Sequence, residues 1–229
     1  VMARKIVGDA RRLRDEMRVK RDGLAGRLRV AVIPTALTWA SHLAARLNDK
    51  HPRIGLTIRS APSQNVLSML ENLEIDAGIT YLDNEPLGRV SSVQLYRETY
   101  RLVCRCDHPM ADLPGVSWGQ IAGQKLCLLT PDMQNRRIIN RNFMEAGAAP
   151  EAMIESNSTV VLAATVARGD WVTILPGDMA DFLVTGMPLV AIPIEGAAIA
   201  HKVGLITEHQ EPHTPVLAAL MREAAALAS

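Results

Sequence analysis

The stretch from Gly26 to Pro52, GRLRVAVIPTALTWASHLAARLNDKHP, constrains the fold of this chain more than any other. An apolar run over residues 28–33 predicts a buried strand, which ends at Pro34 and Thr35. A helical repeat of apolar residues follows, formed by Leu37, Ala40, Leu43, Ala44 and Leu47. A strand that leads through a tight turn into an amphipathic helix is typical of an α/β sheet. The first N–H groups of such a helix face outward and favour an anion or a polar ligand.

The same alternation of strand and helix patterns continues to the end of the chain. The strands are predicted at 54–60, 75–81, 90–95, 99–106, 125–129, 152–156, 171–175, 189–194 and 200–207, and the helices at 63–72, 130–147, 159–168, 176–184 and 214–226. The β-α-β-α-β order at the start predicts a parallel sheet with right-handed crossovers.

We therefore predict two successive α/β lobes of Rossmann-like fold. Residues 26–106 and 201–229 are predicted to form lobe I, and residues 107–200 to form lobe II. The chain is expected to cross between the lobes near residues 101–107 and again near 200–206. A cleft between two such lobes is the usual place for a ligand in this architecture.

Residues 1–25 are predicted to form a linker and dimerisation helix. Six apolar residues recur at steps of three and four, with Lys20 as an interruption: Ala3, Ile6, Ala10, Leu13, Met17 and Leu24. Residues 1–22 hold eight Lys/Arg and four Asp/Glu, a local net charge of +4 in a chain whose net charge is +1. This pattern fits a coiled-coil arm close to nucleic acid, and it also fits a solvated helix with a basic outer face.

Composition and motifs exclude several classes of protein. No apolar stretch approaches the roughly 20 residues that a membrane span needs, and charged residues interrupt every apolar run near the start, unlike a secretion signal. Three cysteines without framework spacing fit a reducing cytoplasm. No motif for nucleotide binding or for nucleophilic catalysis is present, so neither an enzyme nor a cofactor is expected.

The histidines and cysteines offer little chemistry. His209 and His213 are four residues apart, but Pro212 between them disfavours the helix that would pair them around a metal. Cys104 and Cys106 alternate on a predicted strand and are expected to pack rather than to sense metal or redox state. Cys127 has no second cysteine at a sequence distance suitable for a peroxide switch.

Four segments together resemble one known family. An arginine-rich helix runs into GRLRVAVIPT, and IDAGIT, LYRETYRLVCRCDHPMA and VARGDWVTILP follow. These segments resemble the linker helix and effector-binding domain of LysR-type transcriptional regulators over essentially the whole chain. The segment Asp107 to Ala111, DHPMA, is similar to the family's His-Pro-Leu-Ala turn at the first lobe crossing.

The resemblance implies a fold, a function and a set of partners. The fold would be two Rossmann-like lobes that resemble periplasmic solute-binding proteins. The function would be effector sensing in a bacterial regulator, with promoter DNA bound by a helix-turn-helix domain that would lie before Val1. The chain would assemble as a homodimer or homotetramer, and a small anion or polar metabolite would shift the arrangement of the subunits.

The resemblance also implies effector contacts at turns between strands and helices. In lobe I these are Thr35, Ser63, Gln64, Thr80 and Tyr81. Thr35, Ser63 and Gln64 could equally be ordinary helix caps, and Tyr81 could simply pack on the lobe surface. In lobe II the expected contacts are Thr130, Arg136, Asn157 and Ser158. Thr130 could instead cap a helix with Pro131 in its first turn, Arg136 could be solvated together with Arg137, and Asn157 and Ser158 could be caps.

The main alternative is a solute-binding protein of a transport system, which shares the two-lobe fold. The missing signal sequence and the basic apolar pattern of residues 1–25 argue against it. Fold alone cannot decide between the two functions.

Overall fold

The opening strand–turn–helix unit forms as predicted. The computed structural model describes residues 24–196, 200–209 and 212–228, so the predicted linker helix at 1–25 lies almost wholly outside the described residues. Strand β1 (Gly26–Val32) leads into a short 3-10 turn, η1 (Pro34–Ala36), and then into helix α2 (Leu37–Lys50). Ala40, Leu43 and Leu47 are the buried residues of α2 and belong to the predicted repeat.

The described chain divides into two compact units. Unit 1 holds residues 24–33 and Trp39–Tyr96, together with the described residues from Lys202 onward. Unit 2 holds Pro34–Thr38 and the described part of Arg97–His201. Each unit has its own sheet and its own helices.

The sheet of unit 1 is mixed. Its strand order is β2-β1-β3-β11-β4, in which β1 pairs in parallel with β2 and β3, and β11 pairs antiparallel with β3. The other strands are β2 (Ile54–Ser60), β3 (Ala77–Tyr81), β4 (Val90–Glu98) and β11 (His201–Glu208). The predicted parallel β-α-β-α-β unit is therefore confirmed.

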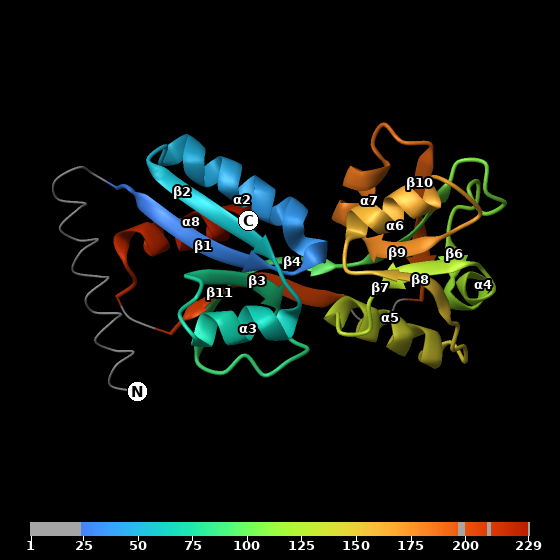
Figure 1. The fold of residues 1–229 in the computed structure, drawn as a ribbon, viewed down its shortest axis with the longest axis horizontal. Helices are drawn as coiled ribbons and strands as arrows, with labels where there is room; N and C mark the ends of the chain where they lie inside the picture. The colour runs from blue at the N-terminus through green and yellow to red at the C-terminus, as the bar shows by residue number, and fades with distance from the viewer. Residues whose placement is uncertain (1–23, 197–199, 210–211, 229) are drawn as a thin grey trace. The chain divides into compact units, whose positions relative to one another are not determined.

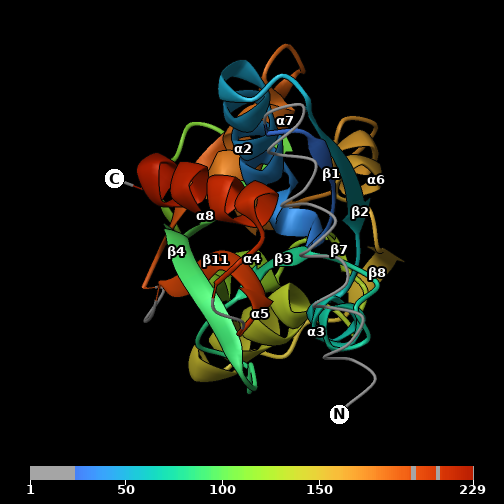
Figure 2. The same ribbon diagram turned by 90° about the vertical axis from the view of Figure 1, so that its left-hand side faces the viewer.

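Helices cover both faces of this sheet (Figures 1 and 2). Helices α2 and α8 (Pro215–Ala228) lie side by side on one face, and α3 (Ser63–Glu71) lies on the other. Gly78 in β3 lets α3 approach closely, because a Cβ atom there would lie 2.5 Å from Cγ1 of Val66. Thr214 caps α8, since its Oγ1 accepts a hydrogen bond from the Leu217 N–H at 3.3 Å.

Unit 2 contains a four-stranded sheet and a separate parallel pair. The sheet order is β6-β10-β5-β9, and the pair is β7-β8, which a bridge between Leu126 and Val172 connects to the chain leading into β9. The strands are β5 (Tyr100–Arg105), β6 (Val116–Ser117), β7 (Leu126–Leu129), β8 (Ala152–Ser156), β9 (Thr173–Pro176) and β10 (Leu189–Glu195). The helices are α4 (Trp118–Ala122), α5 (Gln134–Glu145), α6 (Thr159–Val166) and α7 (Gly177–Val184), and Figure 1 shows α6 and α7 on the opposite side of the strands from α4 and α5.

The structure departs from the predicted boundaries at β5. The sequence places residues 26–106 in lobe I, but β5 pairs antiparallel with β10 and β9 inside unit 2. Only Thr99 separates β4 from β5, and an apolar strand pattern does not reveal which sheet a strand joins. The short elements β6 and α4 carry no repeat long enough to predict.

Candidate functional site

The predicted effector residues of lobe I lie where parallel strands end. The Ile33 N–H donates to the Ile79 carbonyl at 3.1 Å, and the Ala61 N–H donates to the Val32 carbonyl at 2.9 Å. The carboxyl ends of β1, β2 and β3 therefore lie together. In open α/β sheets this edge is where ligands bind.

Thr35 is buried in the turn that follows β1. Its side chain is 2% exposed, and Oγ1 has no hydrogen-bond partner among the described residues. The capping alternative is therefore wrong, since Thr35 lies inside η1 rather than at the start of α2. Two residues later, Leu37 packs against the apolar core of unit 2.

Thr80 and Tyr81 close β3, and both are buried. The Thr80 Oγ1 has no hydrogen-bond partner among the described residues. Tyr81 is one of the largest fully buried side chains, so packing on the lobe surface is excluded. Neither residue presents a side chain to solvent on unit 1.

Ser63 and Gln64 begin α3, and their side chains differ in environment. Ser63 is 1% exposed, and its hydroxyl donates to Glu85 Oε1 at 3.0 Å. Gln64 is exposed. Neither residue is the N-cap, which is Pro62, and α3 has no side-chain cap. The contact between Ser63 and Glu85 cannot be predicted from a local sequence pattern, because Glu85 lies 22 residues further along the chain.

Thr130 lies at the end of β7, and α5 begins later than predicted. The Thr130 N–H donates to the Ser156 carbonyl at 3.2 Å, which extends the β7–β8 pairing. The chain then turns, with the Met133 N–H donating to the Thr130 carbonyl at 3.0 Å, and α5 starts at Gln134. Thr130 is thus no helix cap, and its Oγ1 has no partner among the described residues.

Asn157 and Ser158 follow β8 and lie close to Thr130. The Ser158 N–H donates to Ser156 Oγ at 3.2 Å, and the Ser156 carbonyl accepts from Thr130. Ser158 occupies the N-cap position of α6 as expected, but its side chain makes no capping bond. Asn157 is exposed.

Arg136 is not solvated, so the alternative of a solvated side chain is wrong. It lies in the first turn of α5, is 7% exposed, and its Nη1 donates to the Leu129 carbonyl at 2.8 Å and to Glu155 Oε1 at 2.7 Å. Its Nε donates to Asn140 Oδ1 at 3.0 Å. Internal acceptors thus hold this guanidinium, which explains how a cation tolerates the positive end of a helix.

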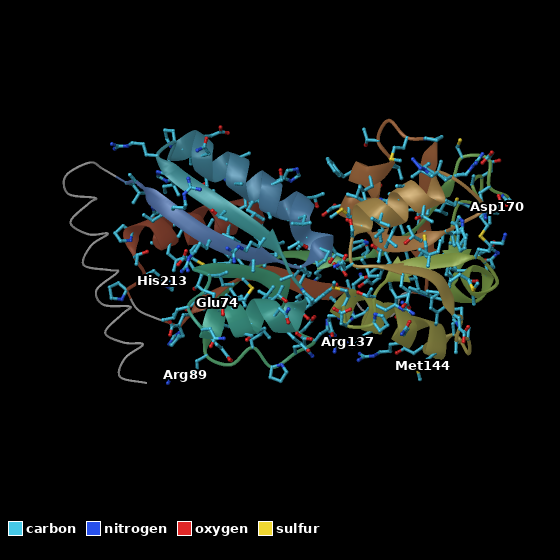
Figure 3. All side chains as sticks on the ribbon, viewed as in Figure 1. Glu74, Arg89, Arg137, Met144, Asp170 and His213 are labelled. Atoms are coloured by element: carbon cyan, nitrogen blue, oxygen red, sulfur yellow. The ribbon has the colours of Figure 1, made fainter. Side chains whose placement is uncertain are left out.

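The prediction missed Gln134 and Asn135, the first two residues of α5. Both are buried, and neither Nδ2 nor Oδ1 of Asn135 has a partner among the described residues. Figure 3 shows Arg137 near this start of α5 and Met144 near its end. With the helix predicted to start at Thr130, Gln134 and Asn135 would lie inside the helix. They were therefore not predicted as residues of a helix start.

Each unit holds buried, uncharged hydrogen-bonding groups near its strand ends. Hydroxyls of Thr35, Thr80 and Thr130 and the amide of Asn135 lack partners, which is costly unless a ligand or water supplies one. The described residues contain no group of three or more His, Cys, Asp or Glu placed to hold a metal ion. None of the described helices combines the length and the apolar character that a membrane span requires.

Two of the three thiols are deeply buried. Burial raises the pKa of Cys104 to about 11, with a smaller contribution from Cys106, and burial also raises the pKa of Cys127 to about 11. Cys106 is exposed. The expectation that the side chains of Cys104 and Cys106 are packed is therefore confirmed for Cys104 and wrong for Cys106.

The comparison with known families places the chain. The family model described as "LysR substrate binding domain" matches residues 21–229. The chain belongs to this family. The LysR substrate binding domain thus accounts for both units, and the predicted resemblance is confirmed.

Curated relatives of this LysR domain are transcriptional regulators. The DNA-binding transcriptional dual regulator OxyR of Escherichia coli K12 is 26% identical over 175 residues, which are 76% of this chain and 57% of that protein. The chain therefore spans little more than half the length of this relative. These relatives do not favour the transport alternative.

Solved LysR-type structures share the fold. The regulatory domain of CcmR from Synechocystis PCC6803, in complex with 2-PG, has a TM-score of 0.77 at 17% identity, with 89% of this chain and 98% of that chain covered. The effector binding domain of QuiR, in complex with shikimate, has a TM-score of 0.74 at 16% identity, with 89% and 97% covered. The predicted fold class, two α/β lobes of the kind found in periplasmic binding proteins, is confirmed.

Proposed function

We propose that this chain is the effector-sensing and oligomerisation region of a LysR-type transcriptional regulator. The groups proposed to bind a small polar molecule are Ser63 and Thr80 in unit 1, and Thr35 and Thr130 in unit 2, all of which lie near strand ends. Ligand binding acts by favouring one arrangement of the subunits over another. The observation that carries the proposal is the set of buried threonine hydroxyls without partners, in a chain of the LysR substrate binding domain family.

The rest of the regulator is proposed from the relatives. Promoter DNA is bound by a segment outside this chain, since the chain spans 57% of OxyR, which is a DNA-binding regulator. The protein works as a homodimer or homotetramer in the cytoplasm, where promoter DNA is found. It is not an enzyme, and its partners are the effector, DNA and copies of itself.

A peroxide response is a second candidate, because several relatives are named hydrogen peroxide-inducible genes activators. A thiol that responds to peroxide needs a lowered pKa and access to solvent. Burial has the opposite effect on Cys104 and Cys127, whose pKa values it raises to about 11. The polar strand ends therefore support a small-molecule effector better than a peroxide response.

The proposal is tested with ligand binding to two threonine variants. A thermal-shift screen of small polar molecules identifies a ligand, because ligand binding stabilises the folded state by mass action. Thr35→Val and Thr130→Val should then each weaken binding by about 1–3 kcal/mol, since each leaves a polar ligand group unpaired. Calorimetry measures this loss.

The fold provides its own controls for this test. Valine removes a hydroxyl that has no partner, so neither variant should unfold at lower denaturant than the wild type. Thr185→Val makes the same chemical change at an exposed site and should leave affinity unchanged. Unchanged affinity in both Thr35→Val and Thr130→Val would show that the strand ends do not bind the effector.

A further inference from the structure

The side chain of Asn135 combines deep burial with two polar atoms that have no partner. The residue is 3% exposed, and neither Oδ1 nor Nδ2 has a hydrogen-bond partner among the described residues. Buried side-chain amides are nearly always hydrogen-bonded, because an unpaired donor or acceptor costs free energy on folding. An apolar side chain of the same shape would avoid that cost. The stability of unit 2 therefore does not explain why an amide lies here.

The carboxamide of Asn135 lies at the start of α5. Asn135 is the second residue of this 12-residue helix. Side chains on a helix lean toward its N-terminal end, so this carboxamide is directed over the turn that precedes α5. Met133 is the N-cap and provides no side-chain hydrogen bond. The first N–H groups of α5, which have no acceptor within the helix, therefore share this region with the unpaired amide.

Thr130 adds a hydroxyl to the same part of unit 2. Its carbonyl accepts a hydrogen bond from the Met133 N–H at 3.0 Å, so Thr130 opens the turn that leads into α5. Figure 1 shows this helix beside β7, the strand that ends next to Thr130. The Thr130 Oγ1 is buried and has no partner among the described residues. Unit 2 alone thus supplies a hydroxyl and a carboxamide around one helix start.

The cation next to Asn135 does not determine the chemistry of this region. Arg136 Nη1 donates to the Leu129 carbonyl at 2.8 Å and to Glu155 Oε1 at 2.7 Å. With that guanidinium held by internal acceptors, the two side chains left without partners are neutral. A carboxamide presents donors and an acceptor side by side. Its best partner is a group with the same pair in the opposite order, such as another amide.

We infer that Asn135 is a specificity-determining residue, which pairs with a neutral effector group that carries a hydrogen-bond donor and an acceptor side by side. This inference rests on the proposed function and narrows the small polar molecule to an amide-like class. A carboxylate offers acceptors only, so it would leave Oδ1 of Asn135 without a donor. The Thr130 hydroxyl can donate or accept, so it adds a bond to either atom of such a group.

An NMR titration with acetamide tests the inference without knowledge of the effector. Acetamide should cause saturable shifts of the side-chain NH2 resonances of Asn135, which are identified by their loss in Asn135→Leu. Acetate and N,N-dimethylacetamide have the same carbon skeleton beside the carbonyl but no N–H donor. Each should bind at least about tenfold more weakly than acetamide, because Oδ1 of Asn135 would stay unpaired.

A change of one atom type at position 135 should change the preferred probe. Asn135→Asp presents acceptors only, so it should bind acetamidine, a cation with donors only, about tenfold more tightly than acetamide. The backbone amides of Gln134 and Arg136 report this binding. Asn48→Asp makes the same change at an exposed position of α2 and should keep the preference of the wild type for acetamide.

Stability without any ligand gives an independent measurement. Asn135→Leu should unfold at a higher urea concentration than the wild type, because it removes a buried amide without partners. Asn48→Leu, on the exposed side of α2, should change the urea midpoint little and keep the response to acetamide. A lower midpoint in Asn135→Leu, together with no acetamide shifts in the wild type, would identify Asn135 as an ordinary structural residue.

The outcomes distinguish this inference from the proposed function. No saturable shift with acetamide, or equal affinity for acetamide, acetate and N,N-dimethylacetamide, would overturn the inference. The variants Thr35→Val and Thr130→Val would still test the proposed function with the ligand from the thermal-shift screen. Selective acetamide binding at Asn135, with that ligand bound equally well by both threonine variants, would contradict the proposed threonine contacts and support the amide selectivity of Asn135.

Discussion

At the scale of single residues, the threonines differ in whether their hydroxyls have partners. Thr214 Oγ1 accepts a hydrogen bond from the Leu217 N–H, whereas Oγ1 of Thr35, Thr80 and Thr130 has no partner among the described residues. A buried polar group without a partner costs about 1–3 kcal/mol. Burial of three such hydroxyls near strand ends therefore lowers the stability of the ligand-free protein, and a ligand that pairs with them would restore it.

Thiol reactivity gives a prediction for single residues. At pH 8 a thiol reagent should modify Cys106 quickly and should not modify Cys104 or Cys127 until the protein unfolds. Burial raises the pKa values of the latter two to about 11, so their thiols stay protonated at that pH and are also inaccessible. Mass spectrometry after timed labelling, with and without denaturant, measures this order.

One labelling result would contradict this prediction. Rapid modification of Cys127 in the folded protein would show that its thiol reaches solvent, and a peroxide response would then become the stronger candidate. Cys106→Ser is the control, because it should abolish the fast phase and leave the slow phase unchanged.

At the scale of elements, the apolar repeats predicted the order of the longer strands and helices. An element boundary was predicted wrongly where a tertiary contact fixes it. The repeat in α2 and the strand runs of β1 to β3 are long enough to fix their type. The start of α5 was wrong because Thr130, Pro131 and Asp132 form a good helix-start pattern, while the Thr130 N–H is held by the Ser156 carbonyl. A pairing with a strand 26 residues away is a tertiary constraint that a local pattern does not contain.

The predicted site shows the same limit. Strand ends can be located from the sequence, so the positions of Thr35, Thr80 and Thr130 near strand ends were predicted correctly, whereas their contact with an effector stays a prediction. The partners of Ser63 and Arg136, which are Glu85 and Glu155, depend on how distant segments meet. Only the structure shows that one predicted contact faces a carboxylate and that another is already paired.

Helices α2 and α8 are joined by an ion cluster that should depend on pH. Glu223 of α8 is buried, and its carboxylate accepts hydrogen bonds from Lys50 Nζ at 3.0 Å and Arg46 Nε at 2.8 Å. The hydrogen bond from Lys50, followed by that from Arg46, holds the pKa of Glu223 below its ordinary value of 4.5. A carboxylate with a lowered pKa stabilises the folded state above its ordinary pKa, and this contribution is lost as the pH falls through the lowered value.

Glu223→Gln should therefore lower the free energy of unfolding by about 1 kcal/mol at pH 7 and by less at pH 3. Urea unfolding at both values measures the difference. Glu208→Gln, a carboxylate exposed at the end of β11, is the control and should change stability little at either pH. An equal loss at pH 7 and pH 3 would show that the charge of Glu223 does not contribute.

At the scale of the whole molecule, an exposed apolar face on α6 supports the proposed oligomer. All residues of α6 are apolar or threonine, and Val160 and Val161 remain 63% and 46% exposed. A helix that is apolar on every side is normally buried. A second copy of the chain would cover this face, since homo-oligomers use the same patch on each subunit.

We expect the full chain to form a higher oligomer, and a chain without residues 1–25 to be reduced to a dimer. Val160→Glu in the shortened chain should then give monomers, because a charge would be buried in the interface. Light scattering over a concentration series measures the masses. Met144→Glu, on the exposed side of α5, should not change the mass of the shortened chain.

Either of two outcomes would contradict this assembly. A full chain that stays monomeric at high micromolar concentration would exclude the oligomer. A shortened chain that remains dimeric with Val160→Glu would place the interface on another face.

The strand order of unit 1 also determines the sequence of events during synthesis. Strand β11 lies between β3 and β4 in the sheet, yet almost the whole of unit 2 is translated before it. When the strands and helices of unit 2 have been translated, the earlier pieces of unit 1 still lack β11 and α8. The sheet of unit 1 therefore cannot be completed until after nearly all of unit 2 has been translated. Until β11 (His201–Glu208) emerges, β3 and β4 lack their shared neighbour and are exposed edges of the kind that chaperones or other chains can pair with.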